Sequence, residues 1–230
     1  MAKKFVSIAI DGPSGSGKST LAKNLAAKLG FAYLDTGALY RTVGLYVMRA
    51  AADPGDAGAV EALLPRINIE CVYSGGVQRM LLNGEDVTGA IRENAVSKYA
   101  SDVSKIPAVR SFLMDIQKDA PKKGDVIMDG RDIGTVIMPN ADVKIFLQAT
   151  CEERAKRRFE ELKDAQGLTY EKILADIKAR DEQDSTRALA PLKPADDAVI
   201  LDNSSFESPD QSLEAALRII KEKRSDVAVR

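Results

Sequence analysis

A glycine-rich stretch near the start of the chain constrains the fold more than any other feature. Residues 12–20 read Gly-Pro-Ser-Gly-Ser-Gly-Lys-Ser-Thr and match the phosphate-loop pattern G-x-x-x-x-G-K-[ST] in full. The apolar run at residues 5–10 is typical of a buried strand, and residues 20–29 have helical spacing that stops at Gly30. Strand, glycine loop and helix in this order predict a binding site for a nucleoside triphosphate.

The chemistry of such a loop follows from its backbone. Glycines can adopt conformations closed to other residues, which lets successive N–H groups point inward around phosphate oxygens at a helix N-terminus. We expect Lys18 to reach the β and γ phosphates and the Ser19 hydroxyl to face a Mg²⁺ ion, with Thr20 close by.

Composition narrows the class of protein. The 230 residues are 45% hydrophobic, which is enough for one α/β domain with elaborations, and the 33 basic and 34 acidic residues almost cancel. We therefore expect neither nucleic-acid nor membrane binding, and no apolar run has the length of a membrane span. Cys71 and Cys151 are too far apart in sequence for a chelating pair, so free thiols in a reducing cytoplasm are the simplest expectation.

The chain contains no histidine. This excludes catalysis by a histidine general base, a phosphohistidine intermediate and any metal site with a histidine ligand.

Apolar runs and helical patterns alternate along the sequence. Five runs are typical of buried parallel strands, at residues 5–10, 31–34, 126–128, 143–147 and 198–201. Helical patterns occupy residues 20–29, 36–51, 107–120, 152–163, 171–181 and 209–223. This alternation predicts a doubly wound, five-stranded parallel sheet with helices on both faces.

One segment breaks the alternation. Residues 67–71 alternate in polarity, a turn at residues 74–76 follows, and residues 77–82 are extended before the hairpin dipeptide Asn83-Gly84. We expect a small antiparallel insertion between the second and third core strands, preceded by a flexible link at residues 53–58.

Charged residues follow several predicted strands. Parallel strands place their carboxyl ends at the ligand crevice, so three segments are candidates for a second substrate site. They are Asp-Thr-Gly-Ala-Leu-Tyr-Arg at residues 35–41, Asp-Gly-Arg-Asp at residues 129–132, and the charged run at residues 180–187. Helix capping, a tight solvated turn and an exposed helix end are the ordinary structural alternatives for these three segments.

Together with the phosphate loop, these segments resemble the bacterial cytidylate kinases of the nucleoside monophosphate kinase group. Five ordered blocks carry the resemblance over essentially the whole chain, at residues 10–18, 35–41, 83–87, 129–135 and 180–187. The sequence departs from the common family pattern in having Thr36 where serine is usual and Ser19-Thr20 where many members have Gly-Thr.

The resemblance implies transfer of a phosphoryl group from ATP to CMP, with dCMP as a second acceptor and Mg²⁺ as the metal. The implied ATP-binding residues are Gly12, Pro13, Ser14, Gly15, Ser16, Gly17, Lys18, Ser19 and Thr20, and Ser19 is the implied metal contact. The implied catalytic residues are Lys18, Arg131, Arg157 and Arg158.

The same resemblance assigns the CMP site. Arg41, Arg110, Arg131 and Arg187 would hold the acceptor phosphate, and Asp184 would meet the ribose. Thr36, Ser101 and Asp132 would surround the cytosine, and Tyr40 and Arg180 complete the implied CMP-binding set.

The resemblance also implies a division of the single domain, residues 1–230. Residues 1–35, 105–150 and 188–230 would form the core, residues 36–104 the monophosphate-binding region with the inserted hairpin, and residues 151–187 the lid and its flanking helices. We expect a cytoplasmic monomer.

Two other functions use the same loop. Another small-molecule kinase, of the adenylate or shikimate type, is the first alternative. A nucleotide-dependent switch is the second, although the guanine-reading pattern Asn-Lys-x-Asp of a GTPase does not occur in the sequence.

Overall fold

The computed structural model describes residues 5–74, 77–161 and 169–228. The chain divides into two compact units, one formed by residues 1–33 and 124–230 and the other by residues 34–123.

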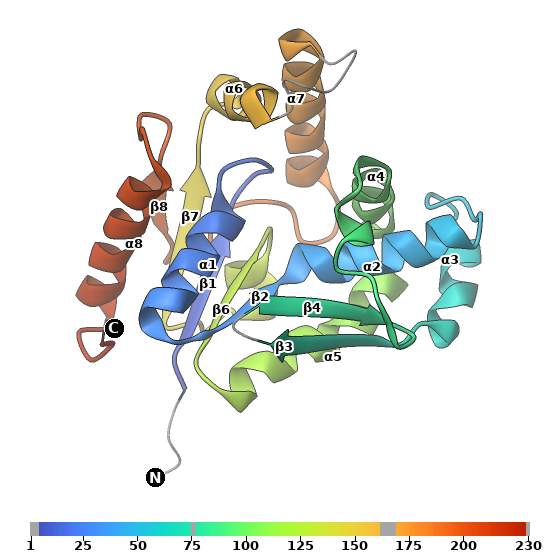
Figure 1. Ribbon diagram of the computed structural model, residues 1–230, viewed down its shortest axis with the longest axis horizontal. Coiled ribbons are helices and arrows are strands. Elements are labelled where there is room, and N and C mark those ends of the chain that lie inside the picture. Colours follow the sequence, from blue (N-terminus) through green and yellow to red (C-terminus); the bar gives the residue numbers. More distant parts are fainter. Residues whose placement is uncertain (1–4, 75–76, 162–168, 229–230) are drawn as a thin grey trace. The chain divides into compact units, whose positions relative to one another are not determined.

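A five-stranded parallel sheet in the order β2-β6-β1-β7-β8 forms the core of the fold (Figure 1). Strand β1 pairs in parallel with β6 and β7, and β7 pairs in parallel with β8. The strands are β1 Ser7–Asp11, β2 Ala32–Asp35, β6 Val126–Gly130, β7 Val143–Gln148 and β8 Val199–Asp202. The predicted doubly wound parallel sheet is confirmed.

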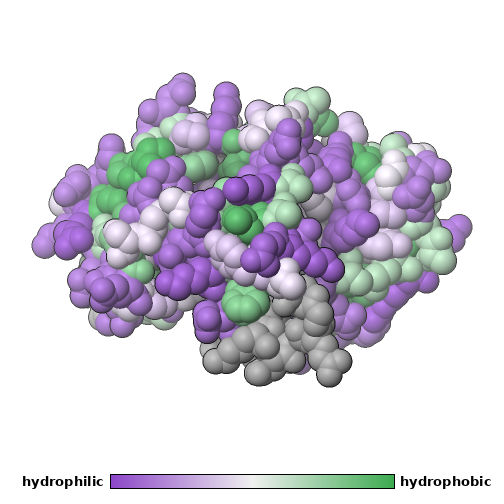
Figure 2. Space-filling model, turned by 90° about the horizontal axis from the view of Figure 1, so that it is seen from above, coloured by the Kyte–Doolittle hydropathy of each residue, from purple (hydrophilic) through white to green (hydrophobic). Residues whose placement is uncertain are grey.

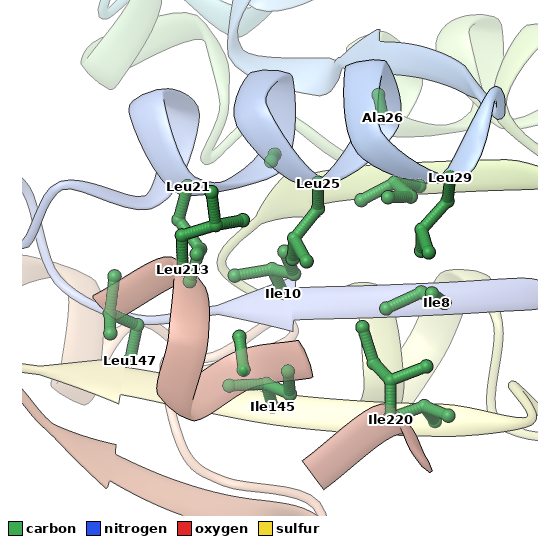
Figure 3. Packing of buried hydrophobic residues seen from close by; sticks show 14 of the residues in the cluster. Ile8, Ile10, Leu21, Leu25, Ala26, Leu29, Ile145, Leu147, Leu213 and Ile220 are labelled. Atoms are coloured by element: carbon green, nitrogen blue, oxygen red, sulfur yellow. The ribbon is translucent and has the colours of Figure 1, made fainter. Parts of the chain in front are cut away.

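Two helices cover one face of this sheet. Helix α1 Lys18–Leu29 directs Leu21 and Leu25 onto Ile8 and Ile10 of β1, and helix α8 Pro209–Lys223 adds Leu213 to the same core (Figure 3). Side chains alternate along a strand, so Asp11 lies on the opposite face from Ile10. There the short π-helix η3 Ile133–Ile137 contacts β1 and β6.

Helices α6 Cys151–Glu161 and α7 Tyr170–Thr186 follow β7 and pack against each other. Phe159 and Tyr170 meet edge to face, with ring centroids 6.5 Å apart. Helix α6 begins one residue before its predicted start, and the Thr150 hydroxyl accepts a hydrogen bond from the backbone N–H of Glu153 at 3.2 Å.

The second unit packs helices on a small antiparallel sheet in the order β3-β4-β5. Its hydrophobic core includes Leu39, Met80 and Leu113, all buried. Asn83 and Gly84 have positive φ angles of 51° and 85°, as a two-residue hairpin turn requires, and this confirms the predicted insertion. The elements are α2 Thr36–Arg49, α3 Ala57–Leu63, η1 Leu64–Arg66, β3 Ile69–Ser74, β4 Val77–Leu82, β5 Glu85–Asp86, η2 Ala90–Arg92, α4 Asn94–Val103 and α5 Pro107–Lys123.

Several local expectations differ from the structure. The predicted flexible link at residues 53–58 is partly wrong, because the Asp56 carboxylate caps helix α3 by accepting from the Ala59 N–H. Helix α4 was not predicted, and α7 continues to Thr186, five residues beyond the predicted end. Ser208 stands at the N-cap position of α8 but makes no capping hydrogen bond with its side chain.

Two predicted features include residues that the structure does not describe. The turn at residues 74–76 and the part of the lid at residues 162–168 lie outside the described residues, Ser74 excepted.

The surface of the face seen in Figure 2 is mostly hydrophilic, with apolar side chains in small patches. Among the described helices, none combines the length and the apolar character needed to cross a lipid bilayer.

Candidate functional site

The phosphate loop lies between β1 and α1, where the predicted pattern places it. Gly12 has φ of 150°, and a Cβ atom there would lie 2.0 Å from the carbonyl oxygen of Leu147. Gly17, with φ of 90°, caps α1 in the left-handed conformation. Both positions therefore require glycine, one for space and one for backbone conformation.

Three polar side chains hold the carbonyl groups of this loop. Lys18 Nζ donates to the carbonyl oxygen of Pro13 at 2.7 Å, and Arg154 Nη1 donates to that of Ser14 at 2.8 Å. Asn203 Nδ2 donates to the carbonyl oxygen of Ser16 at 3.0 Å. Sequence reasoning missed Arg154 and Asn203, because neither forms part of a local motif.

The Lys18 ammonium is buried beneath the loop. Burial, together with the nearby positive charge of Arg131, lowers the pKa of Lys18 from 10.5 to about 7, although Asp129, Asp11 and Asp184 act in the opposite direction. A lysine so placed is charged most readily when an anion lies beside it.

Ser19 and Asp129 face each other at the carboxyl edge of the sheet. The Ser19 hydroxyl donates to Asp129 Oδ2 at 2.8 Å, and the Tyr33 hydroxyl donates to Asp129 Oδ1 at 2.7 Å. Mg²⁺ takes oxygen ligands and is usually held by few protein groups, so this hydroxyl–carboxylate pair fits it. The described residues contain no group of three or more acidic or cysteine side chains that could hold a metal by themselves.

In the first unit, candidate acceptor residues form two neighbouring ion pairs. Arg131 Nε donates to Asp184 Oδ2 at 2.7 Å, and Arg187 Nη2 lies 3.7 Å from Asp132 Oδ1. Burial acts to raise the pKa of Asp184, but the charges of Arg131, Arg180 and Arg187 outweigh it and lower the pKa below its ordinary value. These positions, predicted from distant parts of the sequence, are therefore brought close together in this unit.

The buried carboxylate of Asp11 fixes the backbone next to Arg131 and Asp132. It accepts hydrogen bonds from the N–H groups of Ile133 at 2.8 Å and Gly134 at 2.7 Å. Burial raises the pKa of Asp11 to about 6, although these two hydrogen bonds act in the opposite direction. Sequence reasoning gave Asp11 no role, yet an acidic residue at the end of an apolar strand was a usable signal.

In the second unit, Asp35 organises the start of α2. Its carboxylate accepts from the Ala38 N–H at 2.9 Å and from Arg41 Nη2 at 2.7 Å. Arg41 Nε is buried and has no hydrogen-bond partner among the described residues. Thr36, at the first position of α2, is also buried.

The other candidates in this unit lie on neighbouring helices. Arg110 of α5 is buried, and its guanidinium carbon lies 5.9 Å from the centre of the Tyr40 ring of α2. Ser101 lies in α4, the helix that packs against α2. Four of the predicted residues, Thr36, Tyr40, Arg41 and Arg110, thus lie on α2 or against it.

The two arginines expected from the lid differ in their surroundings. Arg157 donates to the carbonyl oxygen of Asn203 at 2.8 Å and pairs with Glu153 at 3.1 Å. Arg158 is 45% exposed and pairs with Glu161 at 3.0 Å. Arg157 is thus tied to the loop after β8, whereas Arg158 faces solvent.

Arg154, one turn before these residues, is buried and links α6 to α7 through an ion pair with Asp181. Because the same guanidinium reaches Ser14 of the phosphate loop, the base of α6 is tied both to that loop and to α7.

Comparison with known proteins identifies the family. A family model described as cytidylate kinase matches residues 8–222. The chain belongs to the cytidylate kinase family. It is therefore a phosphotransferase, and the resemblance seen in the sequence is confirmed.

Curated cytidylate kinases resemble the chain along most of its length. The enzyme of Caldicellulosiruptor saccharolyticus is 51% identical over 88% of this chain and 90% of its own. That of Bacillus pumilus is 47% identical over 96% of this chain and 100% of its own, and that of Pasteurella multocida 46% identical over 96% and 97%.

Solved structures of low identity share the fold of this cytidylate kinase family member. A gluconokinase from Sinorhizobium meliloti superimposes with a TM-score of 0.51 at 12% identity, covering 97% of this chain and 96% of that chain. An uncharacterized protein from Eubacterium ventriosum gives a TM-score of 0.52 at 13% identity, covering 96% and 99%. The family match favours a cytidylate kinase over an adenylate or shikimate type of kinase and over a switch protein.

Proposed function

We propose that this protein transfers the γ-phosphoryl group of ATP to CMP, giving ADP and CDP, with dCMP as a second acceptor. The observation that carries the proposal is the grouping of charges around Lys18. Arg131, Asp129 and Asp184 all lie close enough to shift its pKa. Phosphoryl transfer needs donor and acceptor groups close together, and this grouping supports the proposal because it brings candidate residues of both kinds near Lys18.

On the donor side, residues 12–20 bind the phosphates of ATP through inward N–H groups, and Lys18 adds its charge. Ser19 and Asp129 hold Mg²⁺, Ser19 by direct contact. When bound there, Mg²⁺ would supply positive charge against the negative charge that develops during transfer. Hydrogen bonding of the Ser19 hydroxyl to Asp129 supports this assignment, because it orients the two oxygen ligands toward each other.

On the acceptor side, the phosphate of CMP needs no general base. A phosphate monoester has a second pKa near 6 and is already mostly a dianion at neutral pH. What the reaction requires is charge neutralisation and in-line positioning, which rigid bidentate guanidinium groups supply. We assign this role to Arg131 and Arg187 in the first unit and to Arg41 and Arg110 in the second.

The remaining acceptor residues bind the nucleoside. Asp184 meets the ribose hydroxyls, with Arg180 beside it, and Thr36, Ser101 and Asp132 surround the cytosine, with Tyr40 nearby. The low pKa of Asp184 supports its part, because a carboxylate that stays ionised accepts hydrogen bonds from both ribose hydroxyls.

Residues 151–187 act as the lid, with residues 36–104 as the monophosphate-binding region and the rest as the core. Closure of the lid brings Arg157 or Arg158 to the transferred phosphoryl group and excludes water, the competing acceptor. The hydrogen bond from Arg157 to Asn203 supports a position for Arg157 near the phosphate loop, because Asn203 also contacts Ser16.

One chain supplies all of these groups, so we propose that the enzyme works as a monomer. We also propose that it acts in the cytoplasm, where its proposed substrates are found. Light scattering of the purified protein at working concentration tests the monomer.

A coupled assay of ADP release across CMP, dCMP, UMP, AMP and shikimate tests the function. We expect the highest kcat/KM with CMP, followed by dCMP. Faster turnover with AMP or shikimate would assign the protein to another small-molecule kinase. ATP binding without acceptor-dependent ADP release would favour a switch.

A further inference from the structure

Asn203 lies directly after β8, at the carboxyl edge of the sheet, and is buried. Its backbone N–H donates to the carbonyl oxygen of Gln148 at 3.0 Å, which extends the pairing of β7 with β8 by one residue. The residue is therefore held by the core sheet rather than by a mobile loop.

The Asn203 side chain acts on the phosphate loop from outside. Its Nδ2 group donates to the Ser16 carbonyl at 3.0 Å and to the Ser212 hydroxyl at 3.3 Å. In a trans peptide the carbonyl of one residue and the N–H of the next point in opposite directions. Because the Ser16 carbonyl points toward Asn203, the Gly17 N–H points away from it.

The orientation of the Gly17 N–H depends on this hydrogen bond, because the peptide between Ser16 and Gly17 can rotate easily. Its φ of 90° is open to glycine and costly to other residues, so the peptide between Ser16 and Gly17 has little conformational restraint of its own. A Cβ at Gly17 would lie 3.7 Å from Asn203 Nδ2, which shows how closely this side chain approaches the turn.

The other end of the same amide faces α6. Arg157 Nη1 donates to Asn203 Oδ1 at 3.3 Å, and Arg157 Nη2 donates to the Asn203 carbonyl oxygen at 2.8 Å. One buried side chain therefore contacts both the phosphate loop and an arginine of α6. Both ends of its amide are used, so neither alanine nor aspartate can replace it fully.

We propose that Asn203 is a positioning residue of the donor site: it fixes the Ser16–Gly17 peptide so that the Gly17 N–H faces the bound phosphates, and it holds Arg157 beside the loop. The inference deepens the proposed function, on which it rests for the identity of the donor. Asn203 acts through Gly17 and Arg157 and does not itself contact the nucleotide.

The test compares three variants in direct titrations with MgADP, followed by steady-state kinetics. Asn203→Ala removes both ends of the amide, whereas Asn203→Asp keeps the shape and the acceptor for Arg157 but loses the donor to Ser16. Ser204→Asp is the matched control, because it places a carboxylate in the same loop and leaves the bond to Ser16 intact.

We expect Asn203→Ala and Asn203→Asp each to weaken MgADP binding about tenfold, the effect of losing about 1.4 kcal/mol from a buried hydrogen bond. The KM for ATP should rise similarly, and the KM for CMP should change less than about twofold. Ser204→Asp should remain within about threefold of wild type in both measurements.

Any one of the following results would overturn the proposal. They are MgADP binding within about twofold of wild type in Asn203→Ala, full binding in Asn203→Asp, and equal weakening by Ser204→Asp. Equal losses for ATP and CMP would indicate general destabilisation, which also contradicts the proposal. MgADP binding is measured without an acceptor, so failure of the CMP assignment would appear separately, as missing CMP-dependent turnover in the wild type.

Discussion

The hydroxyl of Ser19, in the first turn of α1, donates a 2.8 Å hydrogen bond to the carboxylate of Asp129, near the end of β6. These two residues are 110 positions apart in the sequence. This hydrogen bond joins the phosphate loop to the segment that carries Arg131, and it brings together the two side-chain oxygens that we propose as Mg²⁺ ligands.

Replacing the carboxylate of this pair should impair the use of Mg²⁺. We expect Asp129→Asn to raise the Mg²⁺ concentration for half-maximal activity about tenfold and to lower kcat about a hundredfold, because the proposed metal ligand loses its charge. Titration of activity with Mg²⁺ at saturating ATP and CMP measures this. Asp119→Asn, in α5 with its side chain about half exposed, should behave as wild type. An unchanged Mg²⁺ requirement in Asp129→Asn would remove Asp129 from the metal site.

Replacing Lys18 by methionine should nearly abolish catalysis. The change keeps nearly the same side-chain length and removes the positive charge. Because phosphoryl transfer develops negative charge that this ammonium would stabilise, we expect kcat to fall at least about a hundredfold. The coupled assay measures this, with Lys23→Met on the exposed side of the same helix as the control. Turnover near that of the wild type would mean that the phosphate loop is not the donor site.

Replacing Arg131 by alanine should weaken the binding of CMP much more than the binding of ATP. Arg131 is bonded to Asp184, so its loss removes a proposed phosphate ligand and frees the carboxylate proposed to meet the ribose. We expect the KM for CMP to rise at least about tenfold and the KM for ATP less than about threefold. Arg218→Ala, exposed on α8, is the control. Equal losses for both nucleotides in titrations would contradict the acceptor role.

The raised pKa of Asp11 should make the free energy of unfolding fall as pH rises. Comparison with the variant Asp11→Asn isolates this contribution. Because the folded state raises the pKa of Asp11 from 3.8 to about 6, its stabilising contribution is complete below pH 3.8 and is lost as pH rises through 6. Asp11→Asn does not titrate. The free energy of unfolding of the variant minus that of the wild type should therefore increase by roughly 2 kcal/mol between pH 4 and pH 7.

Urea denaturation at several pH values measures this difference, and other titrating groups cancel when the two proteins are compared. A difference that stays constant with pH, or decreases, would show that the pKa of Asp11 is not raised by folding.

The strands and most helices could be predicted from the sequence, because each depends on a local pattern. The helix over Pro209–Lys223 agrees at both ends, since proline marks its first position. Helix α4 was missed because its apolar residues Val96, Ala100 and Val103 are few and lie among polar ones. Helix α7 runs past its predicted end because Asp184 is held within the helix by Arg131 from another element.

The residues of the candidate site also divide into those that a sequence pattern indicates and those that it does not. Lys18 and Ser19 belong to a contiguous motif, and the arginines and acids of the acceptor side entered through the resemblance of whole blocks. Arg154 and Asn203 could not be predicted, because each acts through a hydrogen bond to a backbone carbonyl more than a hundred residues away. A backbone carbonyl accepts from any donor that reaches it, so no residue pattern records the pairing.

The sequence by itself determined a triphosphate loop between a buried strand and a helix, a five-stranded parallel sheet, an inserted hairpin and a chemistry without histidine. These follow from short-range periodicity, from glycine conformations and from composition. The tertiary structure alone decided that Asp129 faces Ser19, that Asp11 fixes the backbone after Asp132, and that Arg154 and Asn203 hold the carbonyls of the loop. Such pairings depend on which strand ends lie side by side, and only the packing of the whole sheet sets that arrangement.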